Sequence, residues 1–141
     1  MIAAVRYLDE VYGLDQRLTE FRAATKGVEL LETFVDFWGN YIPKIYGVAR
    51  ALLAARQTDE AAAAAWDDRM NSVRNGCRQV LETLKSEDRL RPEWNVQEAV
   101  DMMWTILSIE NWERLTVESG WTVEEYVERM KRLLLTAFSR E

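Results

Sequence analysis

The apolar residues of this chain recur at intervals of three and four positions along most of its length, which is the spacing that places them on one face of an α-helix. The 141 residues include only two prolines and six glycines. Such a composition permits long helices and disfavours a β fold with many turns. The sequence therefore predicts an all-α fold, a single-domain helical bundle of about six helices that spans residues 1–141.

In the first third of the chain, glycine and proline mark the predicted helix boundaries. Residues 2–21 carry an apolar face, and Gly13 either kinks one helix or separates two. A further helix is predicted from Val28 to Ile42. Pro43 has no backbone N–H to donate, so it is expected to end that helix and to start the next one, whose apolar face is Ile45, Val48, Leu52 and Leu53.

Capping residues mark the later helices. Thr58 or Asp59 can accept hydrogen bonds from the free N–H groups of an alanine-rich first turn, so a long helix is predicted to begin there. Asn95, followed by Glu98, resembles a capping box and opens a helix predicted over residues 96–118. Apolar residues cover well over half of the circumference of that helix, which indicates burial on two sides.

A tryptophan stands in the turn "ESGWTVEEY" between the last two predicted helices. Gly120 can adopt the left-handed conformation that ends a helix, and Thr122 with Glu125 forms the T-x-x-E capping box that begins one. Trp121 is expected to pack on Tyr126 and on the end of the preceding helix. We favour this structural role over a ligand-binding role, and we expect the last two helices to form a hairpin.

The residue types that are absent exclude several kinds of chemistry. The chain has no histidine, which removes Ser/His and Cys/His dyads, histidine-based zinc sites and Glu-x-x-His di-metal bundles. No paired-acid geometry can be located, so the chain is predicted not to be an enzyme and to hold no metal or cofactor. Cys77 lies in an apolar stripe and is expected to be a small core residue, with a redox-sensing thiol as the alternative.

Charge and hydropathy limit the partners that the chain can bind and the cellular compartment in which it is expected. The net charge of -6 and the lack of a Lys/Arg cluster argue against a chain that grips nucleic acid unaided. A single cysteine excludes an intrachain disulfide and suits a reducing cytoplasm. The uncharged run over residues 102–109 is far shorter than the ~20 residues of a membrane span. We therefore expect a cytoplasmic protein with no membrane segment.

The C-terminal third carries a distinctive order of elements. A basic loop with arginine and proline at residues 89–92 precedes the cap Asn95, an apolar helix with Trp104 near its middle, the turn at residues 118–126 and a leucine-rich last helix. This order resembles the C-terminal part of TetR/AcrR-type bacterial transcription regulators. The upstream stretch "AAWDDRMNSVRNGCRQVLETL" resembles their long central helix, so the similarity covers roughly residues 28–138.

The resemblance implies a regulatory domain, a homodimer that binds a small apolar or aromatic effector and shifts between two helix arrangements. Nothing before Val28 resembles the N-terminal helix-turn-helix of such regulators. DNA is therefore expected to be bound only through a helix-turn-helix module that is not present in this chain. The alternative is a stand-alone interaction module that heterodimerises with a related regulator.

The candidate effector site combines aromatic, methionine and acidic side chains. Helical bundles bind apolar ligands between facing helices, although core packing explains the same aromatic stripe equally well. Glu110 lies beside this stripe, either as a helix-end residue, or in a salt bridge with Arg114, or as a polar ligand contact. The predicted ligand-binding residues are Phe34, Phe37, Trp38, Tyr41, Trp66, Met70, Met103, Trp104 and Glu110.

The candidate dimer interface combines the second apolar face of the helix over residues 96–118 with the last helix. Two copies of this pair would pack as a four-helix bundle. The predicted interface residues are Ala99, Met102, Ile106, Ile109, Tyr126, Met130, Leu133 and Leu134.

Overall fold

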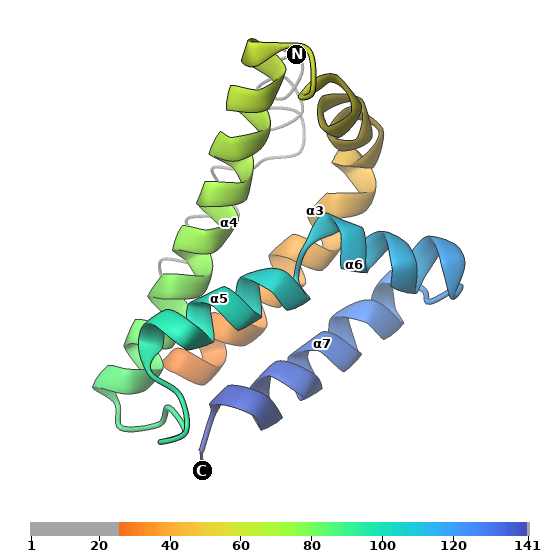
Figure 1. The fold of residues 1–141 in the computed structure, drawn as a ribbon. Helices are drawn as coiled ribbons and strands as arrows, with labels where there is room; N and C mark the ends of the chain where they lie inside the picture. The colour runs from red at the N-terminus through yellow and green to blue at the C-terminus, as the bar shows by residue number, and fades with distance from the viewer. Residues whose placement is uncertain (1–25, 141) are drawn as a thin grey trace.

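A computed structural model describes residues 26–140, which are all-α and form no strand (Figure 1). An isolated bridge pairs Leu90 with Ser139. The all-α prediction is confirmed for this part of the chain, while the helices predicted over residues 2–21 lie outside it. The elements are α3 (Gly27–Ala55), α4 (Glu60–Ser86), α5 (Val96–Ile106), α6 (Ile109–Glu113), the π-helical turn η1 (Arg114–Glu118) and α7 (Val123–Phe138).

Helix α3 lies at the centre of the packing. It packs against α4 on one side and α7 on the other, and α5 packs on α4 (Figure 1). The buried stripes that meet between these helices are the apolar faces that the helical spacing predicts. Side chains from all three long helices are fully buried, among them Leu31, Val35 and Ile42 of α3, Val80, Leu81 and Leu84 of α4, and Tyr126, Leu134 and Phe138 of α7.

The helix boundary predicted at Pro43 is wrong, because α3 is one helix with Pro43 inside it. A proline in a helix interior removes one hydrogen bond and bends the helix, at a cost of about 3 kcal/mol. The axis of α3 accordingly changes direction along its length (Figure 1). The buried stripe continues on both sides of the proline, from Trp38 to Leu52, and its burial offsets that cost.

The single helix predicted over residues 96–118 is also wrong, because the chain breaks after α5 and restarts as α6. The Ser108 hydroxyl accepts a hydrogen bond from the Asn111 backbone N–H at 3.2 Å and caps α6. The Asn111 side-chain amide donates to the Thr105 carbonyl at 2.7 Å. These local bonds give the backbone an alternative to a continuous helix, which apolar spacing alone does not reveal.

The left-handed glycine and the capping box predicted for the turn between η1 and α7 are confirmed. Gly120 has a φ of 77°, the left-handed conformation that glycine adopts without strain. Thr122 forms both bonds of the predicted capping box. The Trp121 backbone N–H donates to the Leu115 carbonyl at 3.0 Å, and its indole ring lies 4.6 Å from the Arg129 guanidinium carbon. The turn is therefore fixed by a backbone bond and a cation–π contact.

The other predicted caps and the loop after α4 are confirmed. Asp59 caps α4 and Asn95 caps α5 through their side chains. Leu90 is buried, and Trp94 turns inward, where its indole N–H donates to the Ala137 carbonyl at 2.9 Å. The loop is thereby attached to the end of α7.

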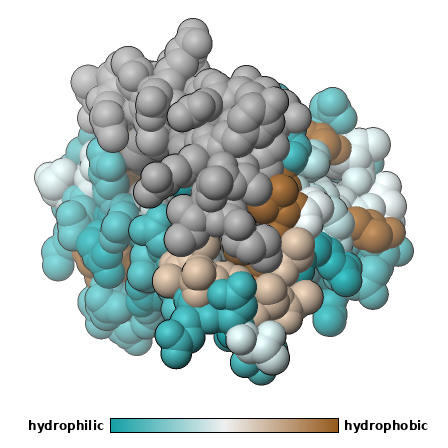
Figure 2. Space-filling model, turned by 90° about the horizontal axis from the view of Figure 1, so that it is seen from above, coloured by the Kyte–Doolittle hydropathy of each residue, from teal (hydrophilic) through white to brown (hydrophobic). Residues whose placement is uncertain are grey.

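The coloured part of the face drawn in Figure 2 is mostly hydrophilic. On the face drawn in Figure 2, hydrophobic residues form small patches among hydrophilic ones. The large hydrophobic side chains exposed within residues 26–140 are Met102 at 44%, Val117 at 60% and Leu133 at 47%. Over the same residues, no helix combines the length and the apolarity that a membrane crossing requires.

Candidate functional site

Two adjoining hollows lie where the second half of α3 and the first half of α4 meet α6. The inner one is an apolar cavity of about 20 Å³. That volume is close to the minimum that holds one water molecule, so the cavity by itself fits only a small chemical group. Its lining residues are Ile45, Val48, Ala49, Leu52, Trp66, Arg69, Met70 and Ile109.

The outer hollow is an open cleft of about 410 Å³. This volume falls in the range of small-molecule sites. Ala49, Trp66 and Ile109 line both hollows and are almost fully buried, so they form the wall between them. The remaining lining residues of the cleft are Arg50, Leu53, Ala54, Glu110, Glu113, Arg114 and Glu118.

A polar cluster fixes one edge of the cleft. The Tyr46 hydroxyl donates to the Glu113 carboxylate, and an Arg50 terminal nitrogen lies 2.9 Å from the same carboxylate oxygen. The hydrogen bond from Tyr46, together with the charge of Arg50, lowers the pKa of Glu113. The Tyr46 ring also packs against Trp112, with ring centroids 5.0 Å apart. Glu113 therefore stays ionised at neutral pH and is held in one position.

The structure divides the predicted ligand-binding residues. Trp66 lines both hollows, Met70 lines the inner cavity and Glu110 lines the cleft. Glu110 is exposed in the first turn of α6, which is the helix-end placement of the sequence alternative. The other six residues line neither hollow: Phe34, Phe37, Trp38, Tyr41, Met103 and Trp104.

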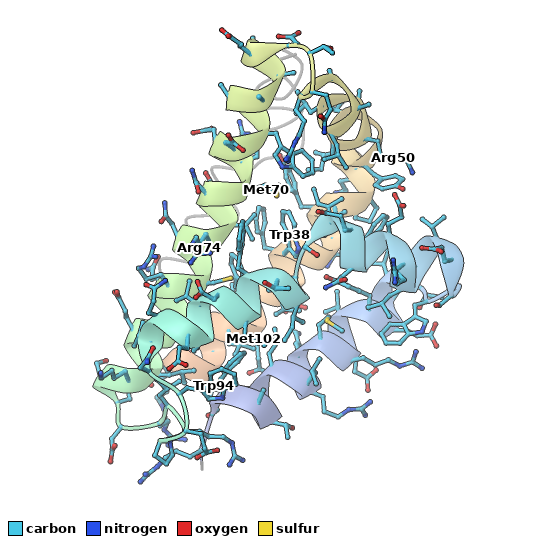
Figure 3. The ribbon with its side chains drawn as sticks, viewed as in Figure 1. Trp38, Arg50, Met70, Arg74, Trp94 and Met102 are labelled. Carbon is cyan, nitrogen blue, oxygen red and sulfur yellow. The ribbon has the colours of Figure 1, made fainter. Side chains whose placement is uncertain are left out.

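The two tryptophans among these six residues use their N–H groups within the fold. The Trp38 indole donates to the Leu107 carbonyl at 2.7 Å, and the Trp104 indole donates to the Met70 carbonyl at 3.0 Å. In Figure 3, Trp38 and Met70 lie between α3 and α4. These indole N–H groups therefore hold backbone segments together, as in a packed core.

Sequence reasoning missed the polar edge of the cleft. Tyr46 and Arg50 stand four positions apart, a spacing that places them on the same face of α3 and gives a weak local signal. Glu113 lies 63 positions beyond Arg50, so nothing in the sequence pairs them. Ala49, at the wall between the hollows, reads as an ordinary small helix residue.

The predicted dimer residues also fall into two groups. Met102 and Leu133 are exposed on α5 and α7, and Ile106 is half-buried. The remaining five are buried in the chain's own core: Ala99 and Ile109 on the broken helix, and Tyr126, Met130 and Leu134 on α7, which packs against α3.

Cys77 has no exposed surface, which confirms it as a core residue of α4. Burial raises the pKa of its thiol to about 12. Within residues 26–140, histidine, cysteine and acidic side chains do not gather in a group of three or more that could hold a metal ion.

Comparison with known proteins found no match among protein-family models, curated proteins or solved structures.

Proposed function

We propose that this chain is a small-molecule-sensing, dimerising regulatory domain of the TetR/AcrR type, with DNA contacts made by a helix-turn-helix module outside it. The observation that carries the proposal is the cleft of about 410 Å³ that shares three wall residues with an apolar cavity. An apolar or aromatic group fits the wall of Trp66 and Ile109. A polar group fits the edge formed by Arg50 and Glu113.

A short stretch of the chain connects the cleft to α7. Ile109 and Glu110 of α6 line the cleft, α6 continues directly into η1, and the turn after η1 leads into α7. A π-helical turn is rare and is often found at functional sites. An effector that displaces α6 would therefore change the position of α7. It shifts the equilibrium between the two helix arrangements only by the difference between its affinities for them.

A larger side chain in the wall between the two hollows tests the proposed effector site. In the Ala49→Met variant, the longer side chain should occupy the inner cavity and narrow the cleft. We expect the Kd of the neutral apolar dye N-phenyl-1-naphthylamine to rise at least tenfold, measured by its fluorescence, because about 1.4 kcal/mol of apolar contact is lost. The matched control is Ala51→Met, an exposed position of the same helix, which should bind the dye as the unaltered chain does.

Dye binding that is unchanged in Ala49→Met, or absent from the unaltered chain, would contradict the proposed effector site. Melting curves of both variants show whether each protein remains folded.

The exposed apolar side chains on α5 and α7 support dimerisation. Leu133→Glu places a charge at a surface position that the proposed interface would bury, and an unpaired buried charge is costly. We expect the dimer Kd to rise at least tenfold, measured by light scattering at micromolar concentration. Val117→Glu is the control, since Val117 is exposed and apolar but lies on η1.

A monomeric unaltered chain would contradict the homodimer. If that monomer pairs with a full-length related regulator, the result favours the alternative, an interaction module that forms heterodimers.

A further inference from the structure

Three arginines line a hollow at the other end of α3. It has a volume of about 750 Å³ and lies between the start of α3, the loop after α4 and the end of α7, three segments that meet in Figure 1. Its lining residues are Val28, Arg89, Arg91, Leu135, Thr136, Ser139 and Arg140. We call this hollow the arginine cleft. Its positive charge is opposite to the net charge of -6 of the chain.

Backbone hydrogen bonds hold the main chain of the arginines in place. The Arg140 N–H donates to the Arg89 carbonyl at 2.7 Å, and the Arg91 N–H donates to the Phe138 carbonyl at 2.8 Å. The Arg91 side chain is fixed as well, because its Nε–H donates to the Thr136 carbonyl at 2.9 Å. The main chain of all three arginines is therefore fixed, and the Arg91 guanidinium is preorganised, which lowers the entropy cost of binding an anion there.

The positive charge of the arginine cleft is only partly neutralised. Arg140 lies 3.6 Å from the carboxylate of Asp88, whose side chain is 91% exposed. Within residues 26–140, neither Arg89 nor Arg91 has a carboxylate at ion-pair distance. Of the three guanidinium groups, only that of Arg140 has a carboxylate at ion-pair distance within the described residues, and that carboxylate is well solvated.

We infer that the arginine cleft binds a small phosphate monoester. Guanidinium groups pair with phosphate oxygens through two parallel N–H bonds, and several arginines match a dianion. Val28 and Leu135 are half-buried apolar residues of the same cleft, and they suit the carbon part of such an ester. This site is separate from the proposed effector cleft and does not depend on it.

Calorimetry of the full chain with phenyl phosphate and with inorganic phosphate tests the inference at low ionic strength. We expect one binding site per chain and a lower Kd for phenyl phosphate, because its ring contacts the apolar residues. Equal affinity for the two probes would overturn the assignment of an ester and leave free phosphate as the ligand. No heat of binding from either probe would overturn the site itself.

Variants that should raise the Kd and one that should lower it test the inference further. Arg89→Ala and Arg140→Ala should each raise the Kd of phenyl phosphate roughly tenfold, because each removes a charge-assisted hydrogen bond. Asp88→Asn should lower the Kd about threefold, because it removes a carboxylate that competes for Arg140. Asparagine tolerates the φ of 57° at this position, so the backbone is preserved.

The matched control is Arg132→Ala, which removes an exposed arginine of α7 outside the cleft. It should bind phenyl phosphate as the unaltered chain does. An equal loss of affinity in Arg132→Ala and Arg89→Ala would indicate a general charge effect and would overturn the inference, as would a Kd that rises in Asp88→Asn. The replaced side chains are exposed, so melting curves should be unchanged and show that each variant folds.

Discussion

Cys77 should react with iodoacetamide at pH 8 at least about a thousandfold more slowly in the folded protein than in concentrated urea. The reacting species is the thiolate. Burial raises the pKa of the Cys77 thiol from its ordinary value of 9.0 to about 12, which lowers the thiolate fraction at this pH about a thousandfold. The side chain also has no exposed surface that the reagent could reach. Mass spectrometry of samples quenched over time measures the rate.

A second cysteine on the same helix provides the control. Ala64 is exposed on α4, so Ala64→Cys should give one thiol that reacts at the rate of a free cysteine and one that stays protected. Two fast thiols in the folded variant would contradict the burial of Cys77 and would favour the redox-sensing alternative. The slow rate that remains reports how often this part of the core opens.

The helix ends that the sequence predicted correctly are those with local chemical signals. The start of α7 needs only Thr122 and Glu125, three positions apart, and the start of α4 needs only Asp59. Each cap involves a side chain and a backbone group within one helical turn, so a short stretch of sequence contains all the partners.

The boundary at Pro43 depends on packing between distant segments, and the break before α6 combines the local bonds of Ser108 and Asn111 with a distant contact. The helix continues through Pro43 because the apolar stripe on both sides of it is buried against the rest of the chain. The break before α6 is supported by Trp38, whose indole donates to the Leu107 carbonyl 69 positions away. Spacing and capping rules describe neighbours in sequence and contain no information about such contacts.

The candidate sites also depend on contacts that the sequence does not reveal. Trp66, Met70 and Glu110 were predicted from residue type, but an aromatic stripe that lines a cleft has the same spacing as one that packs in a core. The arginine cleft was missed because Arg140 lies about 50 positions beyond Arg89 and Arg91, so the sequence shows only the basic loop at residues 89–92. Only the fold brings these charges together.

Replacing Trp38 should cost a large part of the stability of the fold. Its side chain is almost fully buried in α3, so Trp38→Ala should lower the free energy of unfolding by about 3–5 kcal/mol. Trp38→Phe keeps most of the ring but removes the donor to the Leu107 carbonyl, and a buried acceptor without its partner costs about 1–3 kcal/mol. Urea denaturation monitored by circular dichroism measures both changes.

Trp121→Phe is the matched control, because Trp121 is only half-buried and its ring contacts the exposed edge of α7 through Arg129. This change should cost about 1 kcal/mol or less. The Leu107 carbonyl lies at the break before α6, so Trp38→Phe should also accelerate amide hydrogen exchange over residues 107–111, beside the proposed effector cleft. Equal losses in the two phenylalanine variants, with unchanged exchange, would show that the buried bond does not hold this break in place.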